Sequence, residues 1–208
     1  MKKILLLLCA VFVGSALACS GQEVAHGTHN GHPWVDLGLS VKWAKYNVGT
    51  EDPSESGSYF AWGETSPKDE YTDANCLTTG VRLGDISGNP EYDAARSNWG
   101  GEWRMPTKDE YQELIDNCNI IWDPHRKGIL LQSKVNGGLL FLPAVGQGAF
   151  KSEYKDGIVI QFGRLGAYVS STPDTDHYSF GLNFSSENCS VVSYFGRSGG
   201  YSIRPVLN

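Results

Sequence analysis

The sequence predicts one α+β domain in which two helices separate groups of short strands joined by long irregular loops. Glycine contributes 25 residues, and aromatic and charged side chains make up 12% and 19% of the chain. This balance favours short strands, tight turns and irregular loops. The apolar pattern alternates at first, becomes helical twice, and then alternates again to the end of the chain. Residues 33–208 show no linker and no internal repeat, so a single domain accounts for them.

The chain begins with a predicted signal peptide at residues 1–18. Two lysines precede an apolar run over residues 4–14, which is shorter than the roughly 20 residues of a membrane-spanning helix. The tripeptide Ala-Leu-Ala before Cys19 resembles a bacterial lipobox. That resemblance implies cleavage before Cys19 and acylation of its thiol, which anchors the protein to a lipid bilayer. The alternative is ordinary signal-peptidase cleavage that leaves Cys19 as a free thiol.

Residues 19–32 are predicted to form the lipidated N-terminus and a tether, because they are polar and rich in glycine. His26, His29 and His32 recur at a spacing of three residues, which invites a metal site. The neighbouring glycines and Pro33 disfavour the helix that would align them. We therefore expect no metal at these histidines and no other cofactor.

The composition of the mature chain excludes several partners. Without the two lysines of the signal peptide, 15 basic residues face 23 acidic residues, a formal charge of −8. This charge argues against nucleic acid as a partner. Besides Cys19, the cysteines are Cys76, Cys118 and Cys189, so at most one disulfide forms and its pairing stays open. Their spacing fits no zinc site.

The first half of the domain is predicted to contain short strands and one long connection. Residues 34–48 read as strand, turn and strand around Gly38-Leu39-Ser40, and residues 58–64 as a short aromatic strand. Residues 65–90 have no sustained period and many breakers, which indicates a long irregular connection.

Two helices follow. The first covers residues 89–100, with Asn89 as its N-cap and Gly100 as its stop. The second begins with a capping box formed by Thr107 and Glu110. Its buried face is expected to carry Tyr111, Leu114, Ile115 and Cys118.

Short strands separated by turn residues are predicted for the rest of the chain. Within residues 178–185, a period of two places Phe180, Leu182 and Phe184 toward the core and Ser179, Gly181 and Asn183 outward. The predicted strands cover residues 128–135, 137–145, 157–163, 166–172, 178–185, 189–195 and 201–207.

Several motifs occur in an order that resembles a known family. They are "VDLGLSVKWAKYNVG", "GSYFAWGET", "WGGEWRMPTKDEYQELIDNC", "GGLLFLPAVG", "AYVSST" and "YSIRPV". Together they resemble the surface lipoproteins of Bacteroidetes and Fibrobacter that carry the major paralogous domain, over about residues 31–206. The resemblance implies an outer-membrane lipoprotein of the cell envelope, facing the periplasm or the cell surface.

More distantly, "WRMPTKDEYQEL" and "YSIRPV" are similar to the corner and the end of the formylglycine-generating enzymes, which have the C-type-lectin-like fold. This similarity implies two helices around a small, twisted, mostly antiparallel sheet whose first and last strands pair. "VDLGLSVKWA" would then lie beside "YSIRPVL". Tyr46 stands where many relatives of the lipoprotein family have cysteine, so a disulfide from that position to the helix is unavailable.

The residues argue against catalysis. Formylglycine-generating enzymes bind copper through two cysteines near the C-terminus, and this chain has only Cys189 there, which makes a degenerate enzyme of that type a less favoured alternative. A hydrolase would have to use Ser170, Ser171, Asp174, Asp176 and His177, which lie in one polar run typical of a solvated loop. We predict no catalytic residue.

The predicted function is binding of a glycan or a surface protein. The stretch from residue 168 to 201 is rich in tyrosine, serine, asparagine and glycine, a mixture typical of adaptable binding loops. The alternative is a structural subunit of a surface or pilus-like assembly. Calcium at Asp174, Asp176 and Glu187 stays open. The predicted ligand-binding residues are Tyr178, Asn183, Asn188, Tyr194, Arg197 and Tyr201.

A second group of residues is predicted to support the fold. Arg104 is expected to be partly buried, donating to backbone carbonyls or to an acid such as Asp36 or Glu64. The aromatic residues of the same corner are expected to fill the core. The predicted structural residues are Trp99, Trp103, Arg104, Pro106, Thr107 and Arg204.

Overall fold

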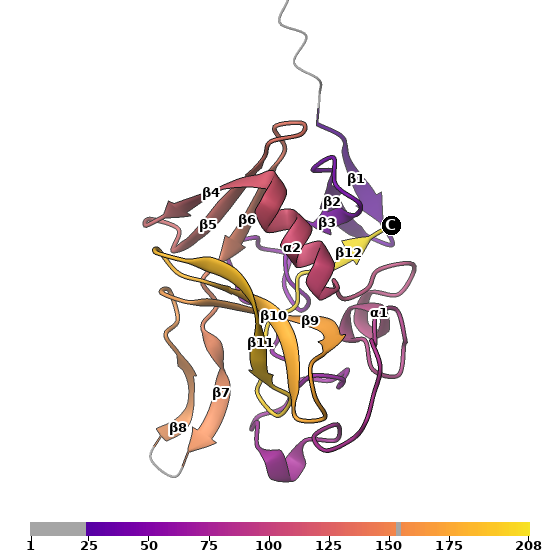
Figure 1. Ribbon diagram of the computed structural model, residues 1–208, viewed down its shortest axis with the longest axis vertical. Coiled ribbons are helices and arrows are strands. Elements are labelled where there is room, and N and C mark those ends of the chain that lie inside the picture. The colour runs from indigo at the N-terminus through magenta and orange to yellow at the C-terminus, as the bar shows by residue number, and fades with distance from the viewer. Residues whose placement is uncertain (1–23, 153–154) are drawn as a thin grey trace, which may run out of the picture.

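The computed structural model describes residues 24–152 and 155–208, except for the side chains of 147–160. The predicted signal peptide and Cys19 lie outside the described residues. The fold is a mixed α+β arrangement in which strands predominate, with two α-helices in the described part (Figure 1). The predicted antiparallel pairing is confirmed, but the strands of the described residues form four separate small sheets, not the single sheet expected.

The first sheet joins the two ends of the domain. It contains β1 (His26–His29), β2 (His32–Val35), β3 (Lys42–Ala44) and β12 (Val206–Leu207), in that order. Val206 lies opposite Trp43, so the predicted pairing of the first and last segments is confirmed.

The predicted tether is wrong for the residues that the structure describes. Strand β1 pairs with β2 through a two-residue turn at Asn30 and Gly31, whose φ angles of 46° and 85° are both positive. Positive φ at both positions suits a tight hairpin turn, for which asparagine and glycine are the preferred residues. The domain therefore begins several residues earlier than expected.

Helix α1 (Ala94–Trp99) begins later than predicted. Its N-cap is Asp93, not Asn89, because the Asp93 carboxylate accepts hydrogen bonds from the backbone N–H groups of Arg96, Gly88 and Met105 at 3.0, 2.7 and 2.8 Å. These three bonds tie the helix to the segments before and after it. The predicted stop at Gly100 is confirmed.

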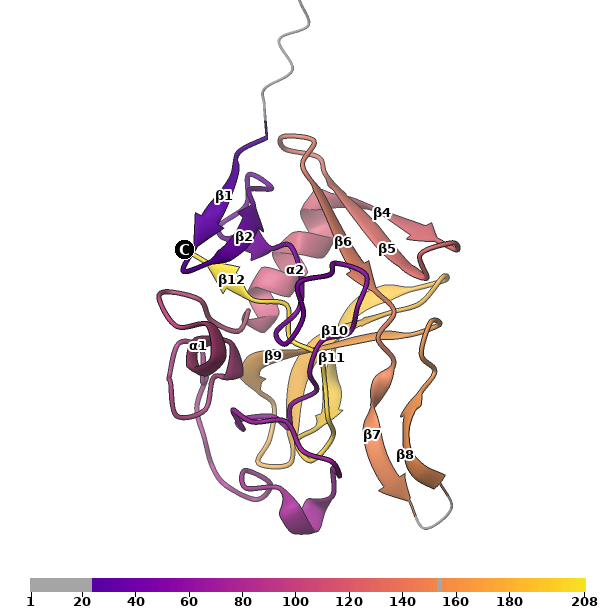
Figure 2. The same cartoon turned by 180° about the vertical axis from the view of Figure 1, so that it is seen from behind.

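Helix α2 (Lys108–Asn117) begins as predicted. Thr107 and Glu110 form the capping box, and Tyr111 and Leu114 are buried. Cys118 is buried as well, whereas Ile115 is only partly buried. The helix packs against the sheet of β9 (Gly166–Pro173), β10 (Tyr178–Phe184) and β11 (Cys189–Gly196), as Figure 2 shows from behind.

The remaining strands form two further sheets. A β4–β5–β6 sheet follows α2 directly, and β7 and β8 form a hairpin. The sequence predicts no strand at β4 and places its first residue, Cys118, on the helix. The bounds are β4 (Cys118–Asp123), β5 (Gly128–Ser133), β6 (Leu139–Pro143), β7 (Gln147–Ser152) and β8 (Lys155–Ile160).

Strand β10 departs from the predicted alternation. Leu182 and Phe184 are buried as expected, but Phe180 is partly exposed, and Ser179 and Gly181 are buried. The register shifts between Ser179 and Gly181. While β10 advances by two residues here, β11 advances by three, from Phe195 to Val192, and β9 by four, from Pro173 to Val169, so the extra residues lie in the neighbouring strands. The regular alternation of β10 is interrupted at this irregular pairing.

Two predicted strands are shorter than expected. Residues 58–64 contribute only an isolated bridge from Phe60 to Tyr201, and the C-terminal strand is limited to β12. The connection over residues 65–90 is irregular, as predicted, apart from the 3₁₀ turn η1 (Asp73–Asn75). In the part of the chain that the structure describes, no helix has the length and apolar character needed to cross a membrane.

Candidate functional site

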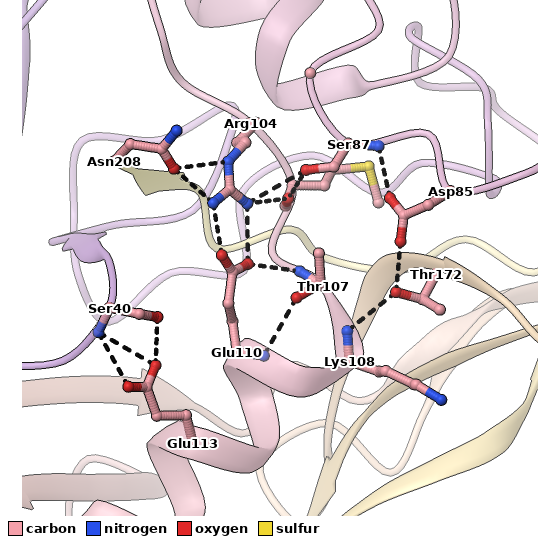
Figure 3. A network of polar contacts seen from close by, with 12 residues as sticks. Ser40, Asp85, Ser87, Arg104, Thr107, Lys108, Glu110, Glu113, Thr172 and Asn208 are labelled. Carbon is pink, nitrogen blue, oxygen red and sulfur yellow. Dashed lines mark hydrogen bonds and ion pairs between the residues drawn. The ribbon is translucent and has the colours of Figure 1, made fainter.

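The corner before α2 is held by a charged pair, shown in Figure 3. Two nitrogens of Arg104 donate to the two carboxylate oxygens of Glu110 at 2.9 and 2.5 Å, and Arg104 also donates to the Asn208 side chain at 2.7 Å. Glu110 in turn accepts from the backbone N–H of Thr107 at 2.8 Å. Both charged side chains are about one-seventh exposed. This geometry fixes the start of α2 against the end of the chain.

Arg104 is partly buried as predicted, but the expected acids were wrong. Asp36 accepts from Gly38, and Glu64 pairs with Lys68 at 2.6 Å, so both carboxylates are used locally. Burial by itself lowers the pKa of Arg104, but the hydrogen bond and charge of Glu110, with the charges of Asp93 and Asp85, raise it overall. The guanidinium therefore stays charged.

The aromatic part of the corner is buried, as predicted. Trp99 is 6% exposed and Trp103 is fully buried. The hairpin of β1 and β2 covers them: the His32 ring stacks on Trp99 with ring centres 3.9 Å apart, and the indole N–H of Trp103 donates to the His29 carbonyl at 2.9 Å. Pro106 is also buried. Burial lowers the pKa of His32, an effect that the charge of Glu51 opposes.

Two of the three histidines of this hairpin, His29 and His32, contact the corner. The Nε2 atom of His29 accepts from the Glu102 backbone N–H at 3.0 Å. Among the described residues, no group of three histidine, cysteine, aspartate or glutamate side chains is placed to hold a metal ion.

Arg204 is structural, as predicted. It is fully buried and donates to the Asn47 side chain at 2.8 Å and to the carbonyls of Ala44 and Lys45 at 3.2 and 2.9 Å. Asn47 donates onward to the carbonyls of Glu55 and Ser56. Burial lowers the pKa of Arg204. The residue thus connects β3, the loop after it and the C-terminal segment.

A cavity of about 550 Å³ opens where β10 begins and β11 ends. Its rim carries Tyr178 and Tyr194, which are 47% and 59% exposed. Three of the six predicted ligand-binding residues therefore come together here. The lining residues are Asp73, His177, Tyr178, Tyr194, Gly196, Ser198 and Tyr201.

Tyr201 and Arg197 are predicted to lie on the binding surface, but both are buried. Tyr201 is fully buried and forms part of the cavity wall, where its backbone pairs with Phe60. Arg197 is 1% exposed, so its predicted role as a direct ligand contact is wrong.

Arg197 instead fastens the loops behind the cavity. Its guanidinium donates to the carbonyls of Thr78, Val81 and Thr175 at 3.1, 2.8 and 2.5 Å, and lies 4.0 Å from the ring centre of Trp62. Burial lowers its pKa, whereas the charges of Asp176 and Cys76 act in the opposite direction. The residue holds three chain segments in fixed positions.

Asn183 and Asn188 lie away from the cavity. Asn183 is paired with Ser190 toward the far end of the β10–β11 ladder, and Asn188 lies in the turn between these strands. Asn188 lines a separate hollow of about 250 Å³ beside Trp122 and Cys189. The six predicted residues therefore do not form one surface.

The calcium hypothesis is not supported by the placement of its residues. Asp174 and Asp176 precede β10, whereas Glu187 follows it. A strand rises about 3.3 Å per residue, so the seven residues of β10 separate these carboxylates by much more than one coordination sphere.

Sequence reasoning did not select Asp73, His177, Gly196 and Ser198 as ligand-site residues. The sequence indicates His177 only as part of a possible hydrolase. Ser170 is a candidate nucleophile of that hydrolase, but its hydroxyl donates to the Phe180 carbonyl at 2.8 Å and is committed to the sheet. Asp73 belongs to η1, far from the others in sequence. The composition of the stretch from 168 to 201 indicated the region, but no local pattern indicated Asp73.

The three described cysteines carry free thiols. Burial raises the pKa of Cys118 to about 11, with Lys134 acting against it, and raises the pKa of Cys189 to about 12. Because the thiolate is the reactive and metal-binding form, both thiols stay protonated and unreactive near neutral pH.

Comparison with known proteins finds no family model, no curated protein and no solved structure that matches this chain significantly.

Proposed function

We propose that this protein is a non-enzymatic, lipid-anchored component of the cell envelope that binds a glycan in the cavity between Tyr178 and Tyr194. The observation that carries the proposal is the pair of half-exposed tyrosines on the rim of a cavity of about 550 Å³. Ligand cavities commonly have volumes of about 300–1,000 Å³ and combine apolar walls with a few polar groups.

The chemistry of the rim suits a sugar. A pyranose presents a flat face of C–H bonds and an edge of hydroxyl groups. The slightly positive C–H face is attracted to the negative face of an aromatic ring. Asp73 accepts hydrogen bonds from hydroxyls, while His177 and Ser198 can donate or accept them. Arg197 keeps the loops behind the site in place before the ligand arrives, which reduces the ordering cost of binding.

We further propose that the fold is C-type-lectin-like and that the chain belongs with the major paralogous domain lipoproteins. The pairing of β3 with β12 and the capped helix after the Trp-Arg corner support this proposal. In the same proposal, Cys19 is acylated and holds the domain at the outer membrane, facing the periplasm or the cell surface.

The other candidate functions have less support. A formylglycine-generating type of copper site needs two thiolates, and burial favours the protonated thiol of Cys189. A surface-protein ligand and a structural role in an assembly use the same exposed tyrosines, so the binding experiment has to separate them from glycan binding.

The test is a glycan array probed with the wild-type domain and with Tyr178→Ala and Tyr194→Ala. Phe162→Ala is the matched control, because Phe162 is 60% exposed and does not line this cavity. We expect glycan binding by the wild type and the control, and at least a tenfold loss in each tyrosine variant. Binding to no glycan, together with a stable complex with an envelope protein, would contradict the proposal.

A further inference from the structure

The cavity has an open floor at Gly196. This residue lies directly opposite Tyr178 in the antiparallel ladder. A Cβ atom built on Gly196 would have no heavy atom within 4 Å beyond its chain neighbours, and its φ angle lies outside the left-handed region. Neither packing nor backbone conformation therefore requires glycine at this position. Its absent side chain leaves space beside the Tyr178 ring.

The contrast with the other glycine of this strand pair supports that interpretation. A Cβ atom on Gly181 would lie 2.6 Å from the carbonyl oxygen of Tyr168 and 2.8 Å from the ring of Phe195. Gly181 is thus needed for close packing in the sheet. Gly196 is the glycine that opens onto the cavity.

The charged groups around this floor are mainly acidic. Asp73 lines the cavity, and the Asp176 carboxylate lies 3.8 Å from the His177 ring. Asp174 is exposed in the same turn. Arg197 also lies near the cavity, but it is buried behind the wall and donates to three backbone carbonyls. Of the described lining residues, only His177 can carry a positive charge.

We propose that this cavity takes the flat face of an uncharged pyranose, which lies over Gly196 between Tyr178 and Tyr194, and that it disfavours acidic sugars. The inference rests on the proposed glycan binding and adds the class of sugar. Asp73 accepts hydrogen bonds from ring hydroxyls. A carboxylate or sulfate on the same ring is repelled by Asp73 and finds no arginine or lysine among the described lining residues.

The steric part is tested with Gly196→Val, since a branched side chain suits a strand and fills the floor of the cavity. Gly84→Val is the matched control, because a Cβ atom at Gly84 also meets no heavy atom within 4 Å and its φ angle lies outside the left-handed region. Melting temperatures are measured for both. We expect both to melt within a few degrees of the wild type, and only Gly196→Val to lose neutral-sugar binding by at least tenfold.

The electrostatic part is tested by titration with neutral oligosaccharides of several stereochemistries and with their counterparts carrying a carboxylate at C6. We expect each neutral sugar that binds to do so at least ten times more tightly than its acidic counterpart. Asp73→Asn is expected to narrow that ratio. Gly196→Ala is the milder variant to use if Gly196→Val fails to fold.

Two results would overturn the inference while leaving glycan binding in place. One is acidic sugars binding as tightly as neutral ones, and the other is wild-type affinity in a folded Gly196→Val protein. If no sugar of either kind binds to the wild type, the proposed function itself fails. The two failures are therefore distinguishable in the same titration series.

Discussion

The corner from Trp99 to Glu110 and the cavity beside Tyr178 and Tyr194 use similar residue types for opposite purposes. In the corner, the aromatic rings are buried and Arg104 and Glu110 satisfy each other. Around the cavity, the two tyrosines stay about half exposed. The densest group of chemically capable residues in the sequence therefore builds the fold. The cavity, which is assembled from distant segments, keeps its side chains available for a ligand.

Three arginines have a similar structural role. Arg104 meets a carboxylate, whereas Arg197 and Arg204 donate to backbone carbonyls, and Arg204 also to an asparagine. Each ties together segments that are remote in sequence. A guanidinium has five donors in a planar arrangement and can satisfy several carbonyls at once. Arginine in this chain is thus a means of fastening irregular loops.

The largest effect is expected at the centre of the corner. Trp103→Ala removes a fully buried indole and its hydrogen bond to the His29 carbonyl. We expect the free energy of unfolding to fall by about 3–5 kcal/mol, as for other large-to-small core changes. Urea denaturation provides the measurement. Trp122→Ala is the control, because Trp122 is only partly buried, and an equal loss in that variant would argue against a special role for the corner.

A smaller loss is expected for Arg104→Ala. The change leaves the largely buried Glu110 carboxylate with its cap bond to Thr107 but without its cation. We expect about 2 kcal/mol of lost stability, which corresponds to roughly 4–8 °C in melting temperature for a domain of this size.

Arg126→Ala is the control for that variant. Its ion pair with Asp123 is more exposed, at 48% and 25%, so we expect a change below about 1 kcal/mol. An unchanged melting temperature in Arg104→Ala would contradict the structural role assigned to this residue.

The smallest effect is expected from acidification of the corner. His32 has a lower pKa in the folded protein than the ordinary value of 6.5, so the unfolded chain binds the proton more readily. The contribution of His32 to the free energy of unfolding should therefore be fully present above about pH 6.5 and should decrease as the pH drops below that value. Melting curves of the wild type and His32→Phe between pH 5 and 8 test this. A steeper fall in melting temperature at acidic pH in His32→Phe than in the wild type would contradict this expectation.

What the sequence predicts well is local. Thr107 and Glu110 predict the start of α2, and Gly100 predicts the end of α1, because helix caps depend on residues within one turn. What it predicts poorly depends on distant partners. Nothing near Arg197 indicates that three carbonyls from two other loops surround it. The register shift beside Ser179 and Gly181 of β10 likewise depends on both neighbouring strands, which carry the extra residues.

Asn30-Gly31 is a strong sequence signal for a tight hairpin turn, whereas the polar composition of residues 19–32 favours a tether, and the structure follows the turn signal. The flanking strands have no apolar alternation because their support comes from Trp99 and Trp103 of the corner. A sheet edge that is stabilised by a distant aromatic cluster leaves little periodic pattern in its own sequence.

The most direct test of this division of roles is the affinity for a glycan that the wild type binds, measured for Arg104→Ala and Tyr178→Ala at a temperature where both are folded. We predict the wild-type Kd for Arg104→Ala despite its lower melting temperature. For Tyr178→Ala we predict at least a tenfold weaker Kd with an unchanged melting temperature. The reverse pattern, lost binding in Arg104→Ala and retained binding in Tyr178→Ala, would place the working site at the corner and contradict this account.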